Sequence, residues 1–497
     1  MKKLQFLILS FAFAMCVPGN AFSQTVNKIQ IEAWITNPDR SALFEKQTDS
    51  IFFDDKSRGW GTPIVIDDAQ EFQSIDGFGF ALTGGSAELL MKMTAAARSK
   101  ILQELFSTDY KSVGISYIRL SIGASDLNSF VFTYNDLKPG EIDMDLKKFS
   151  LSQDLKDVVP VMKEILAINP KIKILGSPWS APEWMKTNYN MRGGSLKKEC
   201  YDVYAQYFVK YIQAMKKEGI TIDAITIQNE PLNSNNTPSM VWFSNEQASF
   251  IKENLGPAFK KAGIVTKIIL FDHNLDRPDY PLSLLHDPEV AKYVDGSGFH
   301  HYGGDMTAMS TMHLARPDKN VYFTEQMVVE AHRSSTIEIA TQVKRLIIGA
   351  SRNWSKNVIL WNLAADSLND PHTDNGGCPM CQGAITIGGD NVFRNIAYYT
   401  IVHASKFVLP GSVRIMSTNT GDKTVSITED EERKGVARAT VIENAQVLPN
   451  VAFKTPDGKI VLIVANDTFT TDYFRVQYKG QTVSIKLKPG AVGTYVW

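Results

Sequence analysis

Two glutamates in this chain each follow a short apolar run, and such a pair could supply the acid and the nucleophile of a hydrolysis. Glu230 ends Ala224-Ile-Thr-Ile-Gln-Asn-Glu-Pro231, and Glu325 lies in Asn320-Val-Tyr-Phe-Thr-Glu-Gln326. Proline biases the preceding residue toward extended geometry and cannot continue a ladder, so we expect Glu230 at the very end of its strand. One carboxyl as general acid/base and one as nucleophile would suit double-displacement cleavage of a glycosidic bond. Either glutamate alone could instead cap a helix.

Other polar and aromatic residues stand in or just after neighbouring apolar runs. A sugar needs such a mixture, because its hydroxyls bind carboxylates, amides and imidazoles while its C–H face binds a flat aromatic ring. Any one of these residues could simply be a core aromatic or a buried histidine, so their common position at strand ends carries the interpretation. The candidate substrate-binding residues are Arg119, Asp126, Trp179, Asn229, His300, Tyr302 and Trp361.

Acidic residues and histidines of the same region could also form a metal site. Asp272, His273, His300 and His301 could supply ligands. The chain has no H-x-x-x-H or H-E-x-x-H spacing on a helix, and the proposed hydrolysis needs no metal. We therefore expect neither a catalytic metal nor another cofactor.

The pair Cys378-Pro-Met-Cys381 follows the last of these apolar runs. In a reducing cell, the spacing would suggest zinc binding or redox work, but no second C-x-x-C is present. In an exported protein, a small disulfide that braces the loop is the favoured interpretation. Free thiols and a redox function remain the alternatives.

Eight short apolar segments alternate with amphipathic segments such as 94–106 and 202–217, where apolar residues recur at helical spacing. Strands that alternate with helices in this way predict an α/β fold, specifically a (β/α)8 TIM barrel, whose strand ends hold the active site. The expected strands are 75–80, 115–122, 171–177, 224–230, 267–273, 294–300, 320–325 and 357–362.

Both ends of the chain are rich in alternating, β-branched segments. The N-terminal strands, 24–36 and 62–67, are too few to build a core alone, whereas several more lie between residue 413 and residue 497. We therefore expect one all-β sandwich side domain built from both chain ends. The expected divisions are a signal peptide at 1–23, N-terminal sandwich strands at 24–70, the catalytic barrel at 71–403 and the rest of the sandwich at 404–497.

The first residues have the pattern of an export signal. Lys2 and Lys3 precede an apolar run, and Ala21-Phe-Ser23 offers a cleavage site before Gln24, which predicts a periplasmic or extracellular protein. Cys16 raises lipoprotein anchoring as an alternative, although Met15 is a poor fit to the small residue that such sites prefer. No later run is long and apolar enough for stable membrane insertion. The 52 Lys and Arg balance 53 Asp and Glu without a basic stripe, so no nucleic-acid partner is expected.

Six stretches together resemble glycoside hydrolase family 30, which includes glucosylceramidases and endo-β-1,6-glucanases. They run through the whole expected barrel, and their combination is specific, although Asn-Glu-Pro alone is shared with a wider clan of barrel glycosidases. The stretches are Asp76-Gly-Phe-Gly79, Arg119-Leu-Ser-Ile-Gly-Ala-Ser-Asp126, Ser177-Pro-Trp-Ser-Ala-Pro-Glu-Trp-Met-Lys186, Thr226-Ile-Gln-Asn-Glu-Pro231, Phe323-Thr-Glu325 and Leu360-Trp-Asn-Leu363.

The resemblance implies that Glu230 is the acid/base and Glu325 the nucleophile of a retaining β-glucoside hydrolase. After the sixth strand this chain has His300-His301-Tyr302, where glucosylceramidases tend to have His-Trp-Tyr. This departure is more similar to the β-1,6-glucanase branch, so an extracellular β-linked glucan is the expected substrate. A glucosylceramidase, an exo-acting β-glucosidase and a non-catalytic carbohydrate-binding protein are the alternatives.

Two properties of the glutamate pair follow from this assignment. The carboxyl groups should lie about 5–5.5 Å apart, as in retaining glycosidases. Glu230 should have a raised pKa before the nucleophile attacks, because it must first act as an acid.

Overall fold

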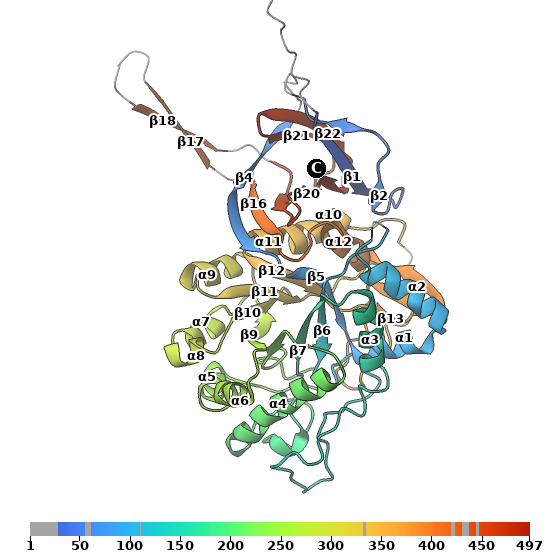
Figure 1. Ribbon diagram of the computed structural model, residues 1–497, viewed down its shortest axis with the longest axis vertical. Coiled ribbons are helices and arrows are strands. Elements are labelled where there is room, and N and C mark those ends of the chain that lie inside the picture. Colours follow the sequence, from blue (N-terminus) through green and yellow to red (C-terminus); the bar gives the residue numbers. More distant parts are fainter. Residues whose placement is uncertain are drawn as a thin grey trace, which may run out of the picture.

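The structure is a computed structural model, and it describes residues 28–54, 61–109, 111–331, 334–418, 423–429, 437–443 and 447–497. It consists of a barrel domain and a β-rich domain that packs against one side of it (Figure 1). The expected signal peptide and Cys16 lie outside the described residues. Among the described residues, no helix combines the length and the apolar composition that crossing a bilayer requires.

Eight parallel strands close into a barrel in the order β10-β11-β12-β5-β6-β7-β8-β9, which confirms the predicted fold class. Their apolar runs are buried on both sides, as a barrel strand requires. Tyr117, Leu175, Ala224, Ile269, Tyr322 and Ile359 come from six of these strands and form one buried cluster. The strands are β5 (Gly77–Leu82), β6 (Tyr117–Ser121), β7 (Lys173–Ser177), β8 (Ala224–Thr226), β9 (Lys267–Asn274), β10 (Gly296–His300), β11 (Asn320–Glu325) and β12 (Ser355–Leu360).

Helices connect these strands around the outside of the barrel. In the helix at 201–217, Tyr204, Tyr207, Phe208 and Tyr211 recur at helical spacing and are fully buried, so one face of the helix anchors it to the barrel. The helices are α1 (Gly84–Lys92), α2 (Ala95–Phe106), α3 (Val158–Ile168), α4 (Tyr201–Lys217), α5 (Ser244–Phe250), α6 (Gly256–Ala262), α7 (Asp279–Leu285), α8 (Pro288–Ala291), α9 (Thr307–Ala315), α10 (Ile339–Gln342), α11 (Gly349–Arg352) and α12 (Ile396–Ser405). Short 3-10 turns, η1 (Glu183–Met185) and η2 (Lys198–Cys200), and π-helical segments, η3 (Ile251–Leu255) and η4 (Val343–Ile348), complete the set.

The second domain is one curled sheet that contains strands from both ends of the chain, as predicted. The first strand pairs with the last, β1 with β23, and β4 pairs with both β16 and β21. Its separate apolar core includes Ile64, Leu462 and Val476. The strands are β1 (Gln30–Thr36), β2 (Glu45–Lys46), β3 (Ile51–Phe52), β4 (Thr62–Ser74), β16 (Val413–Ser417), β19 (Asn450–Lys454), β20 (Ile460–Ala465), β21 (Asp472–Tyr478), β22 (Gln481–Leu487) and β23 (Val492–Val496).

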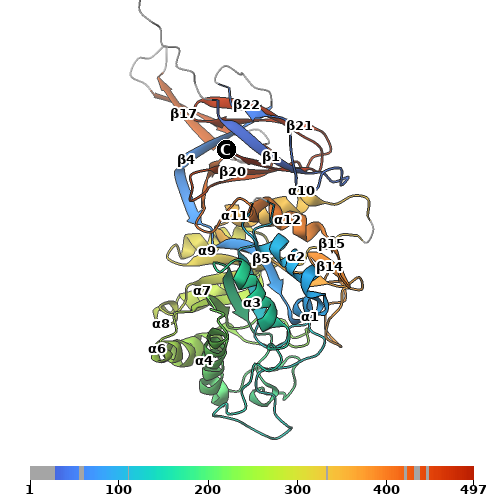
Figure 2. The same ribbon diagram turned by 45° about the vertical axis from the view of Figure 1, so that its right-hand side comes forward.

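Two smaller sheets lie apart from these. The ribbon of β17 (Lys423–Glu429) and β18 (Ala437–Glu443) extends away from the sandwich domain (Figures 1 and 2). The sheet of β13 (Ala364–Ala365), β14 (Ile385–Gly388) and β15 (Asn391–Arg394) belongs to the long loop after β12. This loop therefore has a rigid core of its own beside the barrel mouth.

The sandwich domain is fixed to the barrel through buried polar contacts as well as apolar ones. On α12, His403 Nε2 lies 2.8 Å from Thr36 Oγ1 of β1, and its Nδ1 lies 2.8 Å from Thr494 Oγ1 of β23. Burial lowers the pKa of His403 to about 3, so this histidine is neutral. One barrel helix thus ties the first and last strands of the chain together.

Candidate active site

A cavity of about 420 Å³ opens at the carboxyl ends of the barrel strands. Its walls come from the segments that follow β6, β7, β8, β9, β10, β11 and β12, so residues distant in sequence meet there. The lining residues are Asp126, Trp179, Asn229, Glu230, Leu232, Asn233, Asn236, His273, Asn274, Tyr302, Glu325, Met327, Trp361, Cys378 and Cys381.

Glu230 does not end its strand in extended geometry, so that prediction was wrong. Strand β8 ends at Thr226, and Glu230 has a φ of 47° in the left-handed region. Its backbone N–H donates to Asp272 O at 3.0 Å, and its carboxylate is held by side chains of the next strands. These contacts outweigh the preference that Pro231 imposes on the preceding residue.

The carboxylates of Glu230 and Glu325 face each other around one histidine. Oxygens of the two groups lie within 4.8 Å of each other. His300 Nδ1 lies 3.2 Å from Glu230 Oε1 and 3.7 Å from Glu325 Oε1. This short separation suits a retaining pair, whereas inverting enzymes keep their carboxyls about 6.5–9.5 Å apart to admit a water molecule.

Arg119 lies beneath the pair and is fully buried. Its guanidinium donates to Glu325 Oε2 at 2.5 Å, and to Asn229 Oδ1 and Asp272 Oδ2 at 2.7 Å each. Because Arg119 occupies the amide oxygen of Asn229, the amide nitrogen is the group of Asn229 that can donate to a ligand.

Tyr302 holds the other oxygen of Glu325. Its hydroxyl donates to Glu325 Oε1 at 3.0 Å and accepts from the backbone N–H of Met327 at 2.9 Å. Each carboxylate oxygen of Glu325 thus has a donor, which fixes the orientation of the group at the cavity wall.

The pKa of Glu230 is shifted in the direction opposite to the prediction. Burial raises the pKa of Glu230, but the hydrogen bond and charge of His300, the charge of His273 and the hydrogen bond from Asn233 outweigh it, and the pKa falls to about 2. Burial raises the pKa of Glu325 in spite of His300 and Arg119. Although burial opposes its charge, the surrounding carboxylates raise the pKa of His300 to about 9.

His300 therefore carries the proton that the sequence analysis assigned to Glu230. Its two ring nitrogens both face carboxylates, because Nε2 lies 2.9 Å from Asp272 Oδ1. Glu230, His300 and Glu325 also have the spacing of a metal site. An imidazolium has no free nitrogen lone pair, so the donor set suits a shared proton better than a metal ion.

Two tryptophans and Asp126 form the opposite part of the cavity. The rings of Trp179 and Trp361 lie 5.2 Å apart, and the Arg119 guanidinium lies 4.8 Å from the Trp179 ring. The indole N–H of Trp179 is buried and has no acceptor among the described residues. Burial, with the nearby charges of Glu325 and Glu230, raises the pKa of Asp126 to about 8, so it can donate as well as accept at neutral pH.

The cavity contains most of the predicted residues, but not all of them in the predicted position. Arg119 and His300 do not line it, since both are buried behind the two glutamates and bind those instead. Sequence analysis missed Asn233, whose amide donates to Glu230 Oε2 at 2.7 Å, and Met327 in the wall. Neither belongs to a pattern with a chemical meaning, although Asn233 follows Glu230 by one helical turn.

Cys378 and Cys381 form a disulfide with a Cα–Cα distance of 5.5 Å. Both residues line the cavity, and Cys381 Sγ lies 3.4 Å from Met327 Sδ. The disulfide therefore forms part of the cavity wall rather than a redox pair apart from it.

Comparison with known proteins agrees with this geometry. The family models for the "Glycosyl hydrolase family 30 TIM-barrel domain" and the "Glycosyl hydrolase family 30 beta sandwich domain" match residues 75–408 and 411–495. The chain is 32% identical over 456 residues to the Endo-1,6-beta-D-glucanase neg1 of Aspergillus fumigatus, covering 87% of each chain. It is 27% identical to the mouse Lysosomal acid glucosylceramidase, over 88% of this chain and 84% of that one.

A solved structure of similar shape is that of the endo-beta1,6-glucanase BT3312. It superposes with a TM-score of 0.81 at 32% identity, over 94% of this chain and 99% of that one. With both domains matched and the paired carboxylates in the barrel mouth, the chain belongs to glycoside hydrolase family 30 and is a glycoside hydrolase.

Proposed function

We propose that this protein is a retaining endo-β-1,6-glucanase in which Glu325 is the nucleophile and Glu230 the acid/base. The observation that carries the proposal is the pair of carboxylates within 4.8 Å, each held by its own donors. That spacing leaves no room for a water between nucleophile and sugar, so the first step is attack by a carboxylate.

In the first step, Glu325 attacks the anomeric carbon while Glu230 protonates the departing glycosidic oxygen. Arg119 and Tyr302 fix the two oxygens of Glu325, which leaves little motion to lose before attack. The bond between the sugar and the leaving oxygen breaks as the ester to Glu325 forms, and the inverted glycosyl-enzyme results.

The acid proton comes from the pair formed by His300 and Glu230. Before substrate binds, it resides on the imidazole, 3.2 Å from Glu230 Oε1. Substrate expels water from the cavity, and the loss of solvation favours the neutral form of Glu230 over its carboxylate. The proton then moves to Glu230 and from there to the leaving oxygen.

In the second step, Glu230 removes a proton from water as the water attacks the anomeric carbon, and the second inversion restores the β configuration. In the glycosyl-enzyme Glu325 is an uncharged ester, so it no longer repels the negative charge of Glu230. The amide nitrogen of Asn229 donates to the sugar 2-hydroxyl, a contact that strengthens as positive charge grows on the ring. The unpaired indole N–H of Trp179 and the carboxyl of Asp126 bind further hydroxyls.

The relatives support β-1,6-linked glucan as the substrate. Relatives at 32–33% identity include endo-1,6-β-D-glucanases of Aspergillus fumigatus and Trichoderma harzianum, whereas the mouse glucosylceramidase is 27% identical. The half-buried His301 and the exposed Tyr302 after β10, with the largely polar loop 366–389, suit an open glucan groove better than an apolar, lipid-facing rim.

Azide rescue tests the two catalytic roles. Glu230→Ala should form the glycosyl-enzyme from a substrate with an activated leaving group, and azide should then give the β-glycosyl azide. Glu325→Ala should give the α-azide by direct attack from the vacated face. If both variants give the same anomer, the roles of the two glutamates are misassigned.

The substrate is tested separately with a panel of β-linked glucans and glucosylceramide, with product sizes resolved over time. We expect the mean length of β-1,6-glucan to fall before glucose accumulates. Faster release of glucose from glucosylceramide would favour the lipid substrate, and glucose as the sole early product would mean exo attack.

The proposal also includes the export of the protein and the limits of its domains. We infer export from the N-terminal pattern, to be tested by sequencing the first residues of the mature protein, which should start at Gln24. We also keep the boundaries after residues 70 and 403 as the limits of the catalytic barrel.

A further inference from the structure

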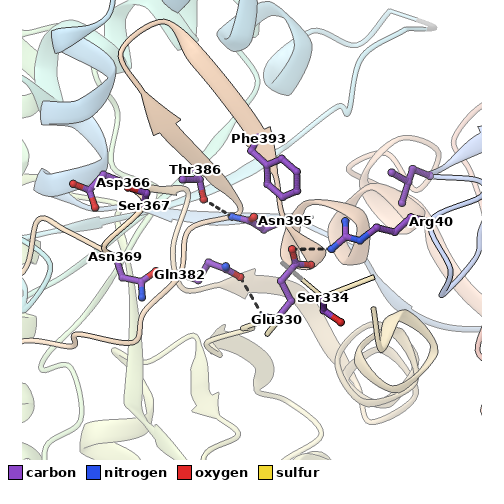
Figure 3. A pocket seen from close by; sticks show the side chains of 11 residues that line it. Arg40, Glu330, Ser334, Asp366, Ser367, Asn369, Gln382, Thr386, Phe393 and Asn395 are labelled. Atoms are coloured by element: carbon purple, nitrogen blue, oxygen red, sulfur yellow. Dashed lines mark hydrogen bonds and ion pairs between the residues drawn. The ribbon is translucent and has the colours of Figure 1, made fainter. Parts of the chain in front are cut away.

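A second pocket, of about 520 Å³, lies where the sandwich domain meets the loops of the barrel mouth (Figure 3). One side is the turn after β1, another is the segment after β11, and the rest is the small sheet in the loop after β12. Its size falls within the range of about 300–1,000 Å³ that is typical of small-molecule sites. No step of the proposed hydrolysis uses it.

The charged floor of this pocket is neutralised within the protein. Arg40 binds Glu330 Oε1 at 2.9 Å, and Glu330 Oε2 accepts from the backbone N–H of Ile396 at 3.0 Å. Both side chains are mostly buried, so the pair is rigid. The pocket therefore offers an anionic ligand no uncommitted cation from Arg40.

An aromatic side chain stands beside this ion pair and forms an apolar wall. Phe393 lies on β15, its side chain lines the pocket, and the residue is 56% exposed. Arg40 lies 5.9 Å from the centre of its ring, and Leu43 also lines the pocket. Asn395 donates to Thr386 Oγ1 at 2.9 Å and to Gly383 O at 2.8 Å, which fixes the hairpin that carries the ring.

Between the floor and the wall lie polar groups with unused capacity. Gln382 is only 9% exposed; its oxygen accepts from Glu330 N at 3.1 Å, while its amide nitrogen has no acceptor among the described residues. Asp366 accepts two backbone N–H groups on one oxygen, which leaves the other oxygen for a ligand. The hydroxyls of Ser367 and Thr386 can donate from the same surface.

We propose that this pocket is a second carbohydrate-binding site, which holds a glucosyl unit of a β-glucan outside the catalytic cavity. An exposed aromatic face beside amide, hydroxyl and carboxylate groups is the surface that a neutral sugar ring requires. The paired Arg40 gives no reason to expect a phosphate or a uronic acid. The inference rests on the proposed function, since it assigns the same class of polymer to a second site.

The position of the pocket explains what the site would do. Two short chain segments contact both the pocket and the catalytic cavity. Met327 and Cys381 line the cavity, and Glu330 and Gln382, which follow them closely in the sequence, line the pocket. A polymer bound at the pocket is thereby held beside the catalytic glutamates, and its local concentration there rises. A short glucoside cannot occupy both places and gains nothing.

The test compares long and short substrates in one variant. Phe393→Ala removes the apolar wall from an exposed position, so the fold should persist. We expect KM for polymeric β-1,6-glucan to rise by about 5-fold or more from the loss of one aromatic contact, with kcat/KM for an aryl β-glucoside unchanged. Phe393→Tyr keeps the ring and should restore the wild-type KM.

Phe469→Ala is the matched control, because Phe469 is fully exposed between β20 and β21 of the sandwich domain and does not line the pocket. Affinity electrophoresis in gels that contain β-1,6-, β-1,3- or β-1,4-glucan reports binding without turnover when each of these proteins also carries Glu325→Ala. Phe393→Ala should lose the retardation that wild type and Phe469→Ala show. If Phe393→Ala is retarded like the wild type in every glucan, the second site is refuted.

The proposed function is tested by measurements that do not involve the second site. Loss of aryl-glucoside hydrolysis in Glu325→Ala and the products from β-1,6-glucan test the active site, and neither depends on Phe393. If the enzyme prefers another glucan, the gel with that glucan still decides whether the pocket binds it.

Discussion

Replacing His300 by glutamine should narrow the pH profile of the enzyme from both sides. The imidazole is fully buried, with Nδ1 between Glu230 and Glu325 and Nε2 at 2.9 Å from Asp272 Oδ1. Glutamine is of similar length and keeps an amide that can donate to a carboxylate. It cannot carry a positive charge or hold a transferable proton.

The size and direction of the change follow from the charges around His300. In the wild type, the catalytic proton leaves near the imidazole pKa of about 9, which sets the alkaline limb. Without the imidazole that limb moves to lower pH. The charge of His300 is also the largest influence that opposes the raised pKa of Glu325, so the acid limb moves to higher pH. Loss of a hydrogen bond to a charged group costs about 1.5–3 kcal/mol, or about a 10- to 150-fold fall in kcat/KM at the optimum.

The assay is kcat/KM for an aryl β-glucoside from about pH 4 to about pH 10, because this quantity reports the ionisations of the free enzyme. His273→Gln is the control: this histidine lies 4.0 Å from Glu230 Oε1 and makes no hydrogen bond with it, and its pKa is lowered mainly by burial. The control should keep the alkaline limb near pH 9. If His300→Gln leaves both limbs where they are, the proton does not reside on His300 and the relay is refuted.

Three further predictions concern the buried groups around the site. Arg119→Met should abolish activity and lower the free energy of unfolding by about 3–5 kcal/mol, because it leaves buried carboxylates unpaired; thermal denaturation with no loss of stability would contradict this. Replacing Cys378 and Cys381 by serine should cost about 2 kcal/mol or less, because the closed loop is so short, as chemical denaturation can measure; a much larger loss would mean that the disulfide holds more than its own loop. Burial raises the pKa of Asp154, which lies beside Tyr134, from 3.8 to about 7. Between these pH values the native state binds a proton that the unfolded state does not. The stability that this proton confers is therefore fully present below pH 3.8 and is lost as the pH rises through 7. Asp154→Asn should therefore stabilise the protein by up to about 4 kcal/mol at pH 8 and have little effect at pH 3; equal effects at both pH values would rule out this account.

The barrel strands were predictable because each is a short apolar run bounded by polar residues, and the order of eight such runs implies the topology. Within the sandwich domain, β21 was harder to predict. The segment at 472–478 alternates buried residues with more exposed ones, among them Arg475 and Gln477, so it lacks a continuous apolar signal. Its pairing with β22 and with β4, which is far away in the sequence, fixes it as a strand.

The meeting of the two glutamates in one cavity could be predicted, but not the location of the proton. Local sequence predicts an extended Glu230 because of Pro231, whereas the structure holds it at a φ of 47° through contacts with β9 and β10. Those contacts place His300 between the carboxylates, and His300 lowers the pKa of Glu230, which was expected to be raised. Charges brought together by folding are not visible in a linear pattern.

The pairing of the first and last strands has a consequence for how the chain is made. Strand β23 lies between β1 and β20, so the sheet stays open in its middle until residues 492–496 have been synthesised. The N-terminal strands must wait for the whole barrel to be synthesised before they find their partner. A nonsense codon just before β23 would leave two interior strand edges bare, and such a truncated product is a substrate for proteolytic quality control rather than a slightly shorter enzyme.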